Sequence, residues 1–407
     1  MSIRPSLLRR SLAFWHRWFG LLAAGWVFVF GLTGSILVFY QEIDRGLNPE
    51  WRAPRPDGAV PRVDPLIAAA EAGRSGAHVF FIDLPDDETE PARMSFAGRE
   101  GFADPPSGLQ VFGDPFTGAL LGERRFGAPK VDRAHFATII YQLHVNLMLG
   151  PVFTWLAGLV AFLWIFDHIA AAVLAFPAAR KWAQSFRIRD GAKGHKLVFD
   201  VHRAGGLWLY GVTLVLAISG VYFNWYDDFR AAVAATLQTA AFYSELAPDR
   251  PAPIYAAAIS ADAAIAIAER RAGAAADSLL IEPRKGHYEV RLFDSRDVKP
   301  YGGRSIYVDM MSGAVLADEH AAAGGAGNAV LAWQYPLHSG QAFGWPGRIL
   351  IFIAGLSVCV FSATGVMIWA RKRKARRASA GRRLGVGRPA GPMSNSSQAN
   401  SPTSSAT

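Results

Sequence analysis

The sequence predicts an all-α membrane protein, a bundle of four transmembrane helices, that carries two external α+β domains. Three observations lead to this prediction. The chain of 407 residues is 51% hydrophobic and has a mean hydropathy of +0.16, which is unusual for a soluble protein of this size. Four apolar stretches are long enough to cross about 30 Å of hydrocarbon. The second half of the chain also repeats the plan of the first. The apolar stretches cover residues 18–40, 136–166, 207–226 and 346–370.

These stretches and the polar segments between them divide the chain into eight regions. Four regions contain the membrane helices: 1–40 with a cytoplasmic N-terminus, 136–174, 202–226 and 346–374. Two regions, 41–135 and 227–345, are the external domains. A basic cytoplasmic loop covers 175–201, and a cytoplasmic tail covers 375–407. The tail is basic and then rich in Gly, Pro, Ser and Asn, a composition that predicts disorder.

The distribution of charge predicts which side of the membrane each region faces. Lys and Arg number four in 4–17, seven in 180–203 and nine in 371–388. The segments 41–135 and 227–345 together hold 30 of the 33 acidic residues, against 21 basic ones. The positive-inside rule therefore places both termini and the basic loop in the cytoplasm, and the two acidic segments outside. The net charge of +9 reflects membrane topology, so we expect no nucleic acid partner.

Two membrane helices begin with the same pattern of residues. Counting from His16 and from His202, Arg follows at +1, Gly at +4, Leu at +5 and Gly at +9. A hydroxyl residue and Gly then occupy +17 and +18, with Tyr at +24 and an acid at +26. Chance agreement at so many fixed offsets is improbable, so we interpret the chain as an internal repeat.

The helices that leave the external segments also match. Each has a Leu-His dipeptide followed by Gly and later by an Ala-Gly-Leu triplet. The symmetry is less complete near the helix ends, where one copy has Asp-His and the other has Thr-Gly. The corresponding residues are Leu143-His144 with Leu337-His338, and Asp167-His168 with Thr364-Gly365.

The external segments share a layout of one helix followed by short strands. In the second segment, Ser260 is the predicted N-cap of a helix over 261–272. In the first, the predicted helix covers 63–73. Each segment is therefore expected to form a small domain with a helix against an antiparallel sheet. The predicted strands lie at 78–84, 92–97 and within 108–123 in the first segment, and at 278–282, 287–293, 304–309 and 314–318 in the second.

Four of the ten histidines occupy repeat-related positions. His16 and His202 are predicted at the cytoplasmic boundary, and His144 and His338 near the outer boundary. A pseudo-twofold axis along the membrane normal would place one pair at each face. Haem is the obvious candidate for a cofactor bridged by two imidazoles, because its iron takes axial ligands from opposite sides of a planar ring. The glycines at +4 and +18 lie near the face of the histidine, where they would give a flat ring room.

These assignments have alternatives. His and Arg at a helix end, beside Trp15 and Trp18, are also typical of a membrane interface. Gly in membrane helices also serves helix–helix contact. His168, in an intramembrane Asp-His pair, is interpreted as a supporting group or as a substitute ligand of the inner haem. The remaining histidines are expected at the protein surface: His78, His135, His195, His287 and His320.

Several stretches resemble the PepSY-associated transmembrane family, which includes iron-regulated inner-membrane proteins and ferric-siderophore reductases of Gram-negative bacteria. They are HRWFGLLAAGWVFVFGLTGSILVF, DVHRAGGLWLYGVTLVLAISGVYF, PLHSGQAFG and SATGVMIWARKRK, with DPFTG and VDMMSG in the external segments. The resemblance covers about residues 10–375. It implies a bacterial inner-membrane protein with two periplasmic PepSY-like domains and a core that holds two haem b groups. The implied axial ligands are His16, His144, His202 and His338. The stretch FDHIAAAVLAFP departs from the family's Thr-Gly-type helix ending, beside the inner haem.

Two functional hypotheses follow. In the first, a cytoplasmic or quinol donor supplies electrons that pass from the inner to the outer haem and reduce a periplasmic ferric-siderophore or other Fe(III) chelate. Arg17 and Arg203 would then pair with haem propionates, or alternatively with lipid headgroups. In the second, the protein is a haem-free membrane scaffold whose PepSY-like domains bind or regulate a periplasmic protein or transporter. No HExxH, GxSxG or P-loop motif supports a hydrolase or a nucleotide-binding protein.

Overall fold

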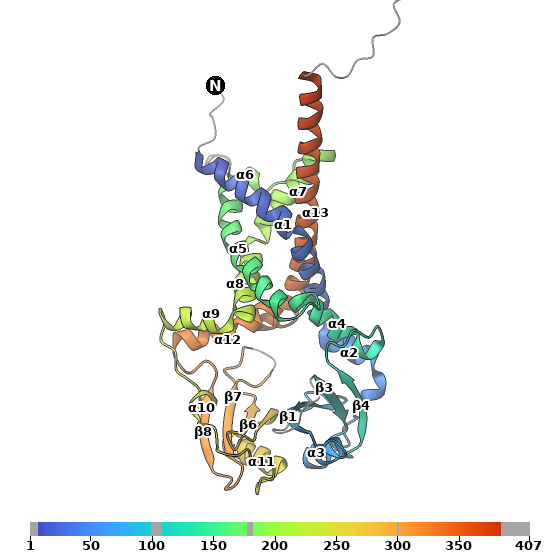
Figure 1. Cartoon of the computed structure of the whole chain (residues 1–407), viewed down its shortest axis with the longest axis vertical. Coiled ribbons are helices and arrows are strands. Elements are labelled where there is room, and N and C mark those ends of the chain that lie inside the picture. The colour runs from blue at the N-terminus through green and yellow to red at the C-terminus, as the bar shows by residue number, and fades with distance from the viewer. Residues whose placement is uncertain (1–6, 99–107, 177–181, 299–300, 384–407) are drawn as a thin grey trace, which may run out of the picture.

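The computed structural model describes residues 7–98, 108–176, 182–298 and 301–383. A group of upright helices stands above a β-sheet, and shorter helices lie between these two parts (Figure 1). Helix α1 begins and helix α13 ends on the side away from the sheet (Figure 1).

The upright helices supply the candidate membrane spans. Three of them are long and apolar enough to cross a membrane: α1 (Leu7–Leu37), α5 (Pro151–Ala175) and α13 (Gly344–Arg383). Helices α7 (Gly194–Trp208) and α8 (Tyr210–Asn224) are bent by 68° and give a fourth span if the pair is counted as one. Helix α1 packs against α13 and α5, α5 packs against α8, and α7 packs against α13. The chain is thus a membrane-associated protein with several apolar helices.

Small residues bring α1 and α13 close together. A Cβ atom added to Gly31 would lie 2.6 Å from the carbonyl oxygen of Gly355, and one added to Gly355 would lie 2.6 Å from the carbonyl oxygen of Gly31. In the same contact, the Ser35 hydroxyl donates a hydrogen bond of 3.0 Å to the carbonyl of Phe352. Glycines that let two backbones meet are a common basis of helix association in membranes.

The prediction of one membrane helix over 136–174 is wrong at its start. Helix α4 (Arg133–Asn146) is capped by Leu147, which has a left-handed φ of 55°, and the span α5 begins only at Pro151. Proline suits the first turn of a helix, where its missing amide hydrogen has no partner to lose, but it breaks a helix that continues through it. His144 therefore lies on a separate short helix that precedes the span.

The second half of the chain has the same break. Helix α12 (Ala326–Ser339) carries His338 and is capped by Gly340, whose φ is 78°. The 3₁₀ helix η3 (Gln341–Phe343) then leads into α13. Helix α12 lies across the end of the upright helices, against α9 (Tyr226–Ala234) (Figure 1).

Other predicted boundaries also need correction. The third membrane helix begins at Gly194 instead of residue 202, and the short helix α6 (Trp182–Ser185) lies within the predicted loop. Helix α13 continues to Arg383, so residues 375–383 of the predicted tail are helical. Residues 384–407, the rest of that tail, lie outside the described residues.

The strands form one antiparallel sheet in the order β4-β3-β2-β1-β5-β6-β7-β8. Strands β1 and β5 join the two external segments, because Phe81 pairs with Leu280 and Asp83 with Ser278. The strands are β1 (Ala77–Asp83), β2 (Ala92–Gly98), β3 (Leu109–Gly113), β4 (Leu120–Arg125), β5 (Ala276–Glu282), β6 (His287–Leu292), β7 (Arg304–Asp309) and β8 (Val315–His320).

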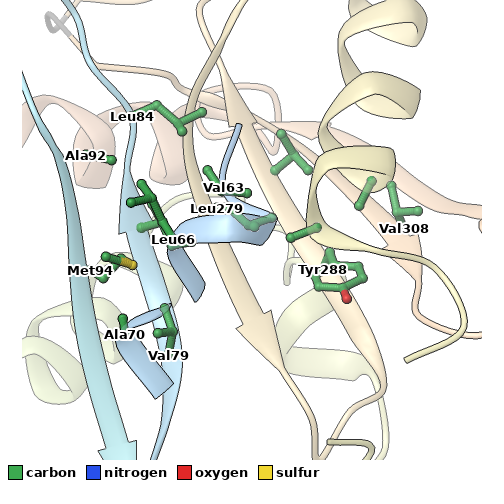
Figure 2. Close-up of a cluster of buried hydrophobic side chains, with 14 of the residues drawn as sticks. Val63, Leu66, Ala70, Val79, Leu84, Ala92, Met94, Leu279, Tyr288 and Val308 are labelled. Atoms are coloured by element: carbon green, nitrogen blue, oxygen red, sulfur yellow. The ribbon is translucent and has the colours of Figure 1, made fainter. Parts of the chain in front are cut away.

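The two external segments share one hydrophobic core, whereas the sequence predicted two separate domains. Helices α3 (Asp64–Glu71) and α11 (Ala261–Ala272) supply buried residues to it, and so do strands of both segments. Figure 2 shows Leu66 and Met94 of the first segment near Leu279 of the second. The predicted cap is confirmed, since the Ser260 hydroxyl accepts a hydrogen bond from the amide of Ala263.

The N-termini of α3 and α11 support each other. The carboxylate of Asp262 accepts a hydrogen bond of 2.6 Å from the amide of Val63, and that of Asp64 accepts one of 2.9 Å from the amide of Ala261. Each carboxylate thereby serves amides that a helix N-terminus leaves without an internal partner. The remaining connections are α2 (Tyr40–Leu47), η1 (Pro49–Trp51) and α10 (Tyr243–Leu246).

Candidate functional site: two histidine pairs

The structure places the four repeat-related histidines in two pairs. His16 on α1 faces His202 on α7, with ring centroids 6.1 Å apart and ring planes at 61°. His144 on α4 faces His338 on α12, with centroids 6.2 Å apart and planes at 66°. The two geometries nearly coincide, although the pairs come from different sets of helices. We call them the inner pair (His16 and His202) and the outer pair (His144 and His338).

The two pairs lie near opposite ends of the membrane helices. His16 and Thr33 are both on α1, and Thr33 contacts His144 of the outer pair. Thr33 follows His16 by 17 positions, which span about 25 Å of helix at about 1.5 Å per residue. That distance is close to the thickness of the hydrocarbon layer, about 30 Å. The outer pair is on the side of the sheet.

Every histidine of the two pairs uses Nδ1 for a hydrogen bond to a neighbouring helix. The partners belong to α1, α5, α8 and α13, one helix for each histidine. In the inner pair, His16 Nδ1 lies 3.0 Å from the Asp167 carboxylate, and His202 Nδ1 lies 3.0 Å from Thr364 Oγ1 and 3.1 Å from the Phe361 carbonyl. In the outer pair, His144 Nδ1 lies 3.2 Å from both Thr33 Oγ1 and the Phe30 carbonyl, and His338 Nδ1 lies 2.7 Å from Ser219 Oγ.

The three hydroxyl partners show which imidazole nitrogen carries the proton. Thr33, Ser219 and Thr364 each donate their hydroxyl hydrogen to the backbone carbonyl four residues earlier, at 2.6 to 2.7 Å. A hydroxyl group has one hydrogen to donate, so each oxygen accepts from the imidazole Nδ1–H. The neutral imidazole then has its lone pair on Nε2. Within the described residues, none of the four Nε2 atoms forms a hydrogen bond.

The sequence-based predictions do not include these Nδ1 partners, although the repeat contains the signal. The hydroxyl groups at +17, on Thr33 and Ser219, hold the outer histidines. The aligned Asp167 and Thr364 hold the inner ones. The four partner residues thus occupy two pairs of aligned positions, and each accepts a hydrogen bond from a histidine Nδ1. An alignment of the two halves of the chain shows this correspondence.

Two glycines next to these partners give the imidazoles room. A Cβ atom added to Gly34 would lie 2.9 Å from Cε1 of His144, and one added to Gly365 would lie 3.2 Å from Cε1 of His202. The glycines at +4 behave differently, because a Cβ atom on Gly20 or Gly206 would meet nothing within 4 Å. The helices that carry the inner pair therefore face open space one turn beyond each histidine.

Asp167 differs from the other three partners because it carries a charge. Its side chain is buried on α5, and among the described residues its carboxylate has only the His16 imidazole as a hydrogen-bond partner. A buried carboxylate in a membrane helix is costly unless a positive charge is nearby. A cation held by the inner pair would supply that charge.

His168 lies apart from the inner pair. Its Nδ1 donates to the carbonyl of Trp164 at 2.8 Å, and its Nε2 lies 3.0 Å from the hydroxyl oxygen of Thr213. Both ring nitrogens therefore have partners in this structure. Asp167, the preceding residue, is the one that contacts His16.

The two repeat-related arginines have different surroundings. Arg203 donates to the carbonyls of residues 184, 185 and 187 and to Asp200 at 3.1 to 3.3 Å, so its guanidinium holds the connection that precedes α7. Arg17 stacks on Phe14 and Trp18, with its guanidinium carbon 5.7 and 5.8 Å from the ring centres. Its Nε is buried and has no hydrogen-bond partner in the described part of the chain. The Arg203 guanidinium is therefore engaged by protein acceptors, whereas the Arg17 Nε–H remains available to donate a hydrogen bond.

The prediction that the five remaining histidines lie at the protein surface is wrong for four of them. His78, His135, His287 and His320 are buried, whereas His195 is exposed. Burial of His287 lowers its pKa to about 4. In the described ranges, no group of three or more His, Cys, Asp or Glu side chains could hold a metal ion.

The helices, the sheet and the paired histidines define a membrane protein with several apolar helices and an antiparallel sheet on one side. The chain belongs to the PepSY-associated transmembrane family, because the model of this family, described as the PepSY-associated TM region, matches residues 13–372. No match was found among curated proteins.

Proposed function

We propose that the protein is a dihaem oxidoreductase of the bacterial inner membrane, in which each histidine pair ligates one haem b iron. The observation that carries the proposal is the geometry of the pairs. A metal–imidazole bond is about 2.0 Å long, and a ring nitrogen lies roughly 1.1 Å from its ring centre, so each ligating ring centre lies about 3.1 Å from the metal. Two rings on opposite sides of the metal therefore have centroids about 6.2 Å apart. The separations in the structure are 6.1 and 6.2 Å.

The hydrogen bonds of the imidazoles support the same assignment. Histidines that bind metals usually donate the other ring N–H to a carbonyl, carboxylate or hydroxyl, which fixes the tautomer and the ring orientation. All four Nδ1 atoms have such a partner, so all four Nε2 atoms are left for a metal. Two protein ligands suffice for haem iron, because the porphyrin supplies the others.

Two further observations fit a haem beside the inner pair. Open space lies next to Gly20 and Gly206, and the buried Nε of Arg17 has no partner among the described residues. A haem propionate is an anion that a guanidinium would bind. Arg203 is occupied by protein groups, which favours Arg17 as the propionate partner.

Haem with two imidazole ligands supplies a one-electron centre that has no open position for substrate. The chain holds one such site near each end of its membrane helices, so the arrangement suits electron transfer across the membrane. In the proposed direction, a cytoplasmic or quinol donor reduces the inner centre, and a ferric-siderophore or other Fe(III) chelate is reduced on the sheet side, in the periplasm. Fe(II) is a softer ion than Fe(III), so hard oxygen donors hold it less well and iron is released.

An absorption spectrum of the purified full chain tests the proposal. We expect a Soret band that shifts on reduction with dithionite and a haem content of two per chain. His16→Ala or His202→Ala should remove the inner haem, and His144→Ala or His338→Ala the outer one. His195→Ala is the matched control, since this exposed histidine is on α7 with His202 and should leave both haems in place. Folded protein without a Soret band would contradict the proposal and favour the scaffold hypothesis.

A further inference from the structure

A cavity of about 380 Å³ lies on the sheet side of the membrane helices. Helices α8, α9 and α12 line it from above and strands β6, β7 and β8 from the sheet. Its volume lies in the range of small-molecule sites, roughly 300–1,000 Å³. Five tyrosines contribute to its wall: Tyr222, Tyr226, Tyr301, Tyr307 and Tyr335.

Aromatic side chains connect this cavity to the outer pair. Phe223 lies between His338 and Tyr335, with ring centroids 5.2 Å from the former and 6.2 Å from the latter. Tyr335 in turn packs against Tyr301, another residue of the cavity wall, with ring centroids 5.3 Å apart. Tyr335 also precedes His338 by only three residues on α12. A molecule in the cavity would therefore be within a few side chains of the imidazole.

The charged residues of the cavity show which ligands it could accept. Its wall contains three carboxylates, of Glu245, Glu289 and Glu319, against two guanidiniums, of Arg230 and Arg291. Arg230 pairs with Glu245 at 2.5 Å, and Arg291 with Glu289 at 2.9 Å. Glu319 accepts a hydrogen bond of 2.9 Å from the amide of Tyr243 and has no ion-pair partner in the described part of the chain. The lining thus has one excess negative charge, which disfavours a polyanion.

We propose that this cavity is the binding site for the electron acceptor, and that it selects ferric chelates that are neutral or positively charged overall. This inference rests on the proposed function. A ferric trihydroxamate fits these requirements, because three monoanionic donors neutralise Fe(III) and the tyrosines offer hydroxyl groups and flat apolar faces. A ferric tris-catecholate is trianionic and is repelled by the lining.

The electron balance of the step is simple. The chelate's Fe(III) gains one electron and becomes Fe(II), and the outer centre is oxidised by one electron. No bond forms between the chain and the chelate, and the donor on the opposite side restores the lost electron.

The internal repeat provides a matched control. Tyr141 on α4 precedes His144 by three residues, as Tyr335 precedes His338. The exposed fractions are similar, 42% for Tyr141 and 39% for Tyr335. Tyr141 instead packs against Phe126, with centroids 5.2 Å apart, and it does not line the cavity. The two substitutions therefore disturb equivalent neighbours of the outer pair, but only one changes the cavity.

Binding is measured first, with redox-inert gallium chelates, so that the result does not depend on haem. Isothermal titration of the full chain in detergent should show binding of a Ga(III) trihydroxamate. Tyr335→Ala should weaken it by about tenfold, the loss expected for one aromatic contact. Tyr226→Ala, at an exposed cavity residue, is a second variant in case Tyr335→Ala does not fold, and Tyr141→Ala should change the affinity less than twofold. The inference would be overturned if both cavity variants bound the Ga(III) trihydroxamate as tightly as the unmodified chain does. It would also be overturned if the unmodified chain bound a Ga(III) tris-catecholate as tightly as the trihydroxamate.

Stopped-flow spectroscopy then tests electron transfer. Protein reduced under anaerobic conditions should be reoxidised by the ferric trihydroxamate at least tenfold faster than by the tris-catecholate at equal concentration. Tyr335→Ala should slow the reaction with the trihydroxamate, and Tyr141→Ala should not. Gallium binding without a haem spectrum would leave the cavity in place and contradict the oxidoreductase. Haem-loaded protein that reacts with both chelates equally would refute the cavity assignment alone.

Discussion

Under the proposed ligation of a haem iron by the inner pair, Asp167→Asn is expected to raise the reduction potential of that centre. Asp167 is the only charged group among the four Nδ1 partners, and its carboxylate lies 3.0 Å from His16 Nδ1. A negative charge beside an axial ligand favours the oxidised iron, which carries one more positive charge than the reduced iron. The asparagine carbonyl still accepts a hydrogen bond from Nδ1–H, so the substitution removes the charge and retains the contact.

The size of the shift follows from the distances. The Asp167 contact is 3.0 Å long, and half of the ring separation of 6.1 Å is about 3 Å. With the width of the ring included, the charge lies roughly 7 Å from the midpoint of the pair, where two unit charges interact by about 2.4 kcal/mol at an effective dielectric constant of about 20. A one-electron potential changes by about 59 mV for every 1.4 kcal/mol. We therefore expect an increase of about 100 mV.

A spectroelectrochemical redox titration of the purified chain measures both centres. Thr364→Val is the control, because it removes a neutral acceptor of the other inner ligand, His202, which retains the Phe361 carbonyl at 3.1 Å. It should shift the inner potential by less than about 30 mV. The outer centre, about 25 Å away along α1, should change little in either variant. The same shift in both variants, or an unchanged inner potential in Asp167→Asn, would refute the reasoning.

Two more predictions concern the outer pair and the external sheet. Gly34→Ala should displace His144 and reduce the content of the proposed outer haem, because its Cβ atom would lie 2.9 Å from the imidazole. Gly25→Ala on the same helix is the control, because its Cβ atom would meet nothing within 4 Å and should leave the haem content unchanged. Haem is quantified by absorbance, and equal haem content in the two variants would contradict the contact argument. His287 is fully buried and burial lowers its pKa to about 4, so the unfolded chain binds a proton first as pH falls below about 6.5 and the free energy of unfolding should drop by up to about 3 kcal/mol by pH 4. Urea unfolding of the full chain between pH 7.5 and 4.5, followed by circular dichroism, should show a steeper loss of stability than in His287→Leu; parallel slopes would count against this role.

Much of the architecture was predictable from local patterns. Apolar length predicted the membrane helices near their observed positions, and alternation with turn residues predicted the strands. Ser260 and the periodic alanines after it predicted helix α11 with its observed bounds. Each of these signals depends on a few neighbouring residues, so the sequence carries it in full.

The break before α5 was harder to predict. Apolar residues continue on both sides of Leu147, so hydropathy alone shows no interruption there, whereas the polar residues around Gly340 lie before the predicted span at 346–370. The break depends on left-handed backbone and on Pro151, and both are weaker signals than a long apolar stretch. Their effect on the site is large, because His144 and His338 approach each other from helices that precede the spans.

The sequence by itself determined which histidines would be paired. Residues at the same offset in two copies of one plan occupy equivalent positions, so His16 had to correspond to His202 and His144 to His338. Only the tertiary structure decided what surrounds each imidazole. The Nδ1 partners come from helices distant in the chain, and the sharing of one sheet depends on β1 pairing with β5, nearly 200 residues later. Such contacts depend on how whole elements pack, which no local pattern specifies.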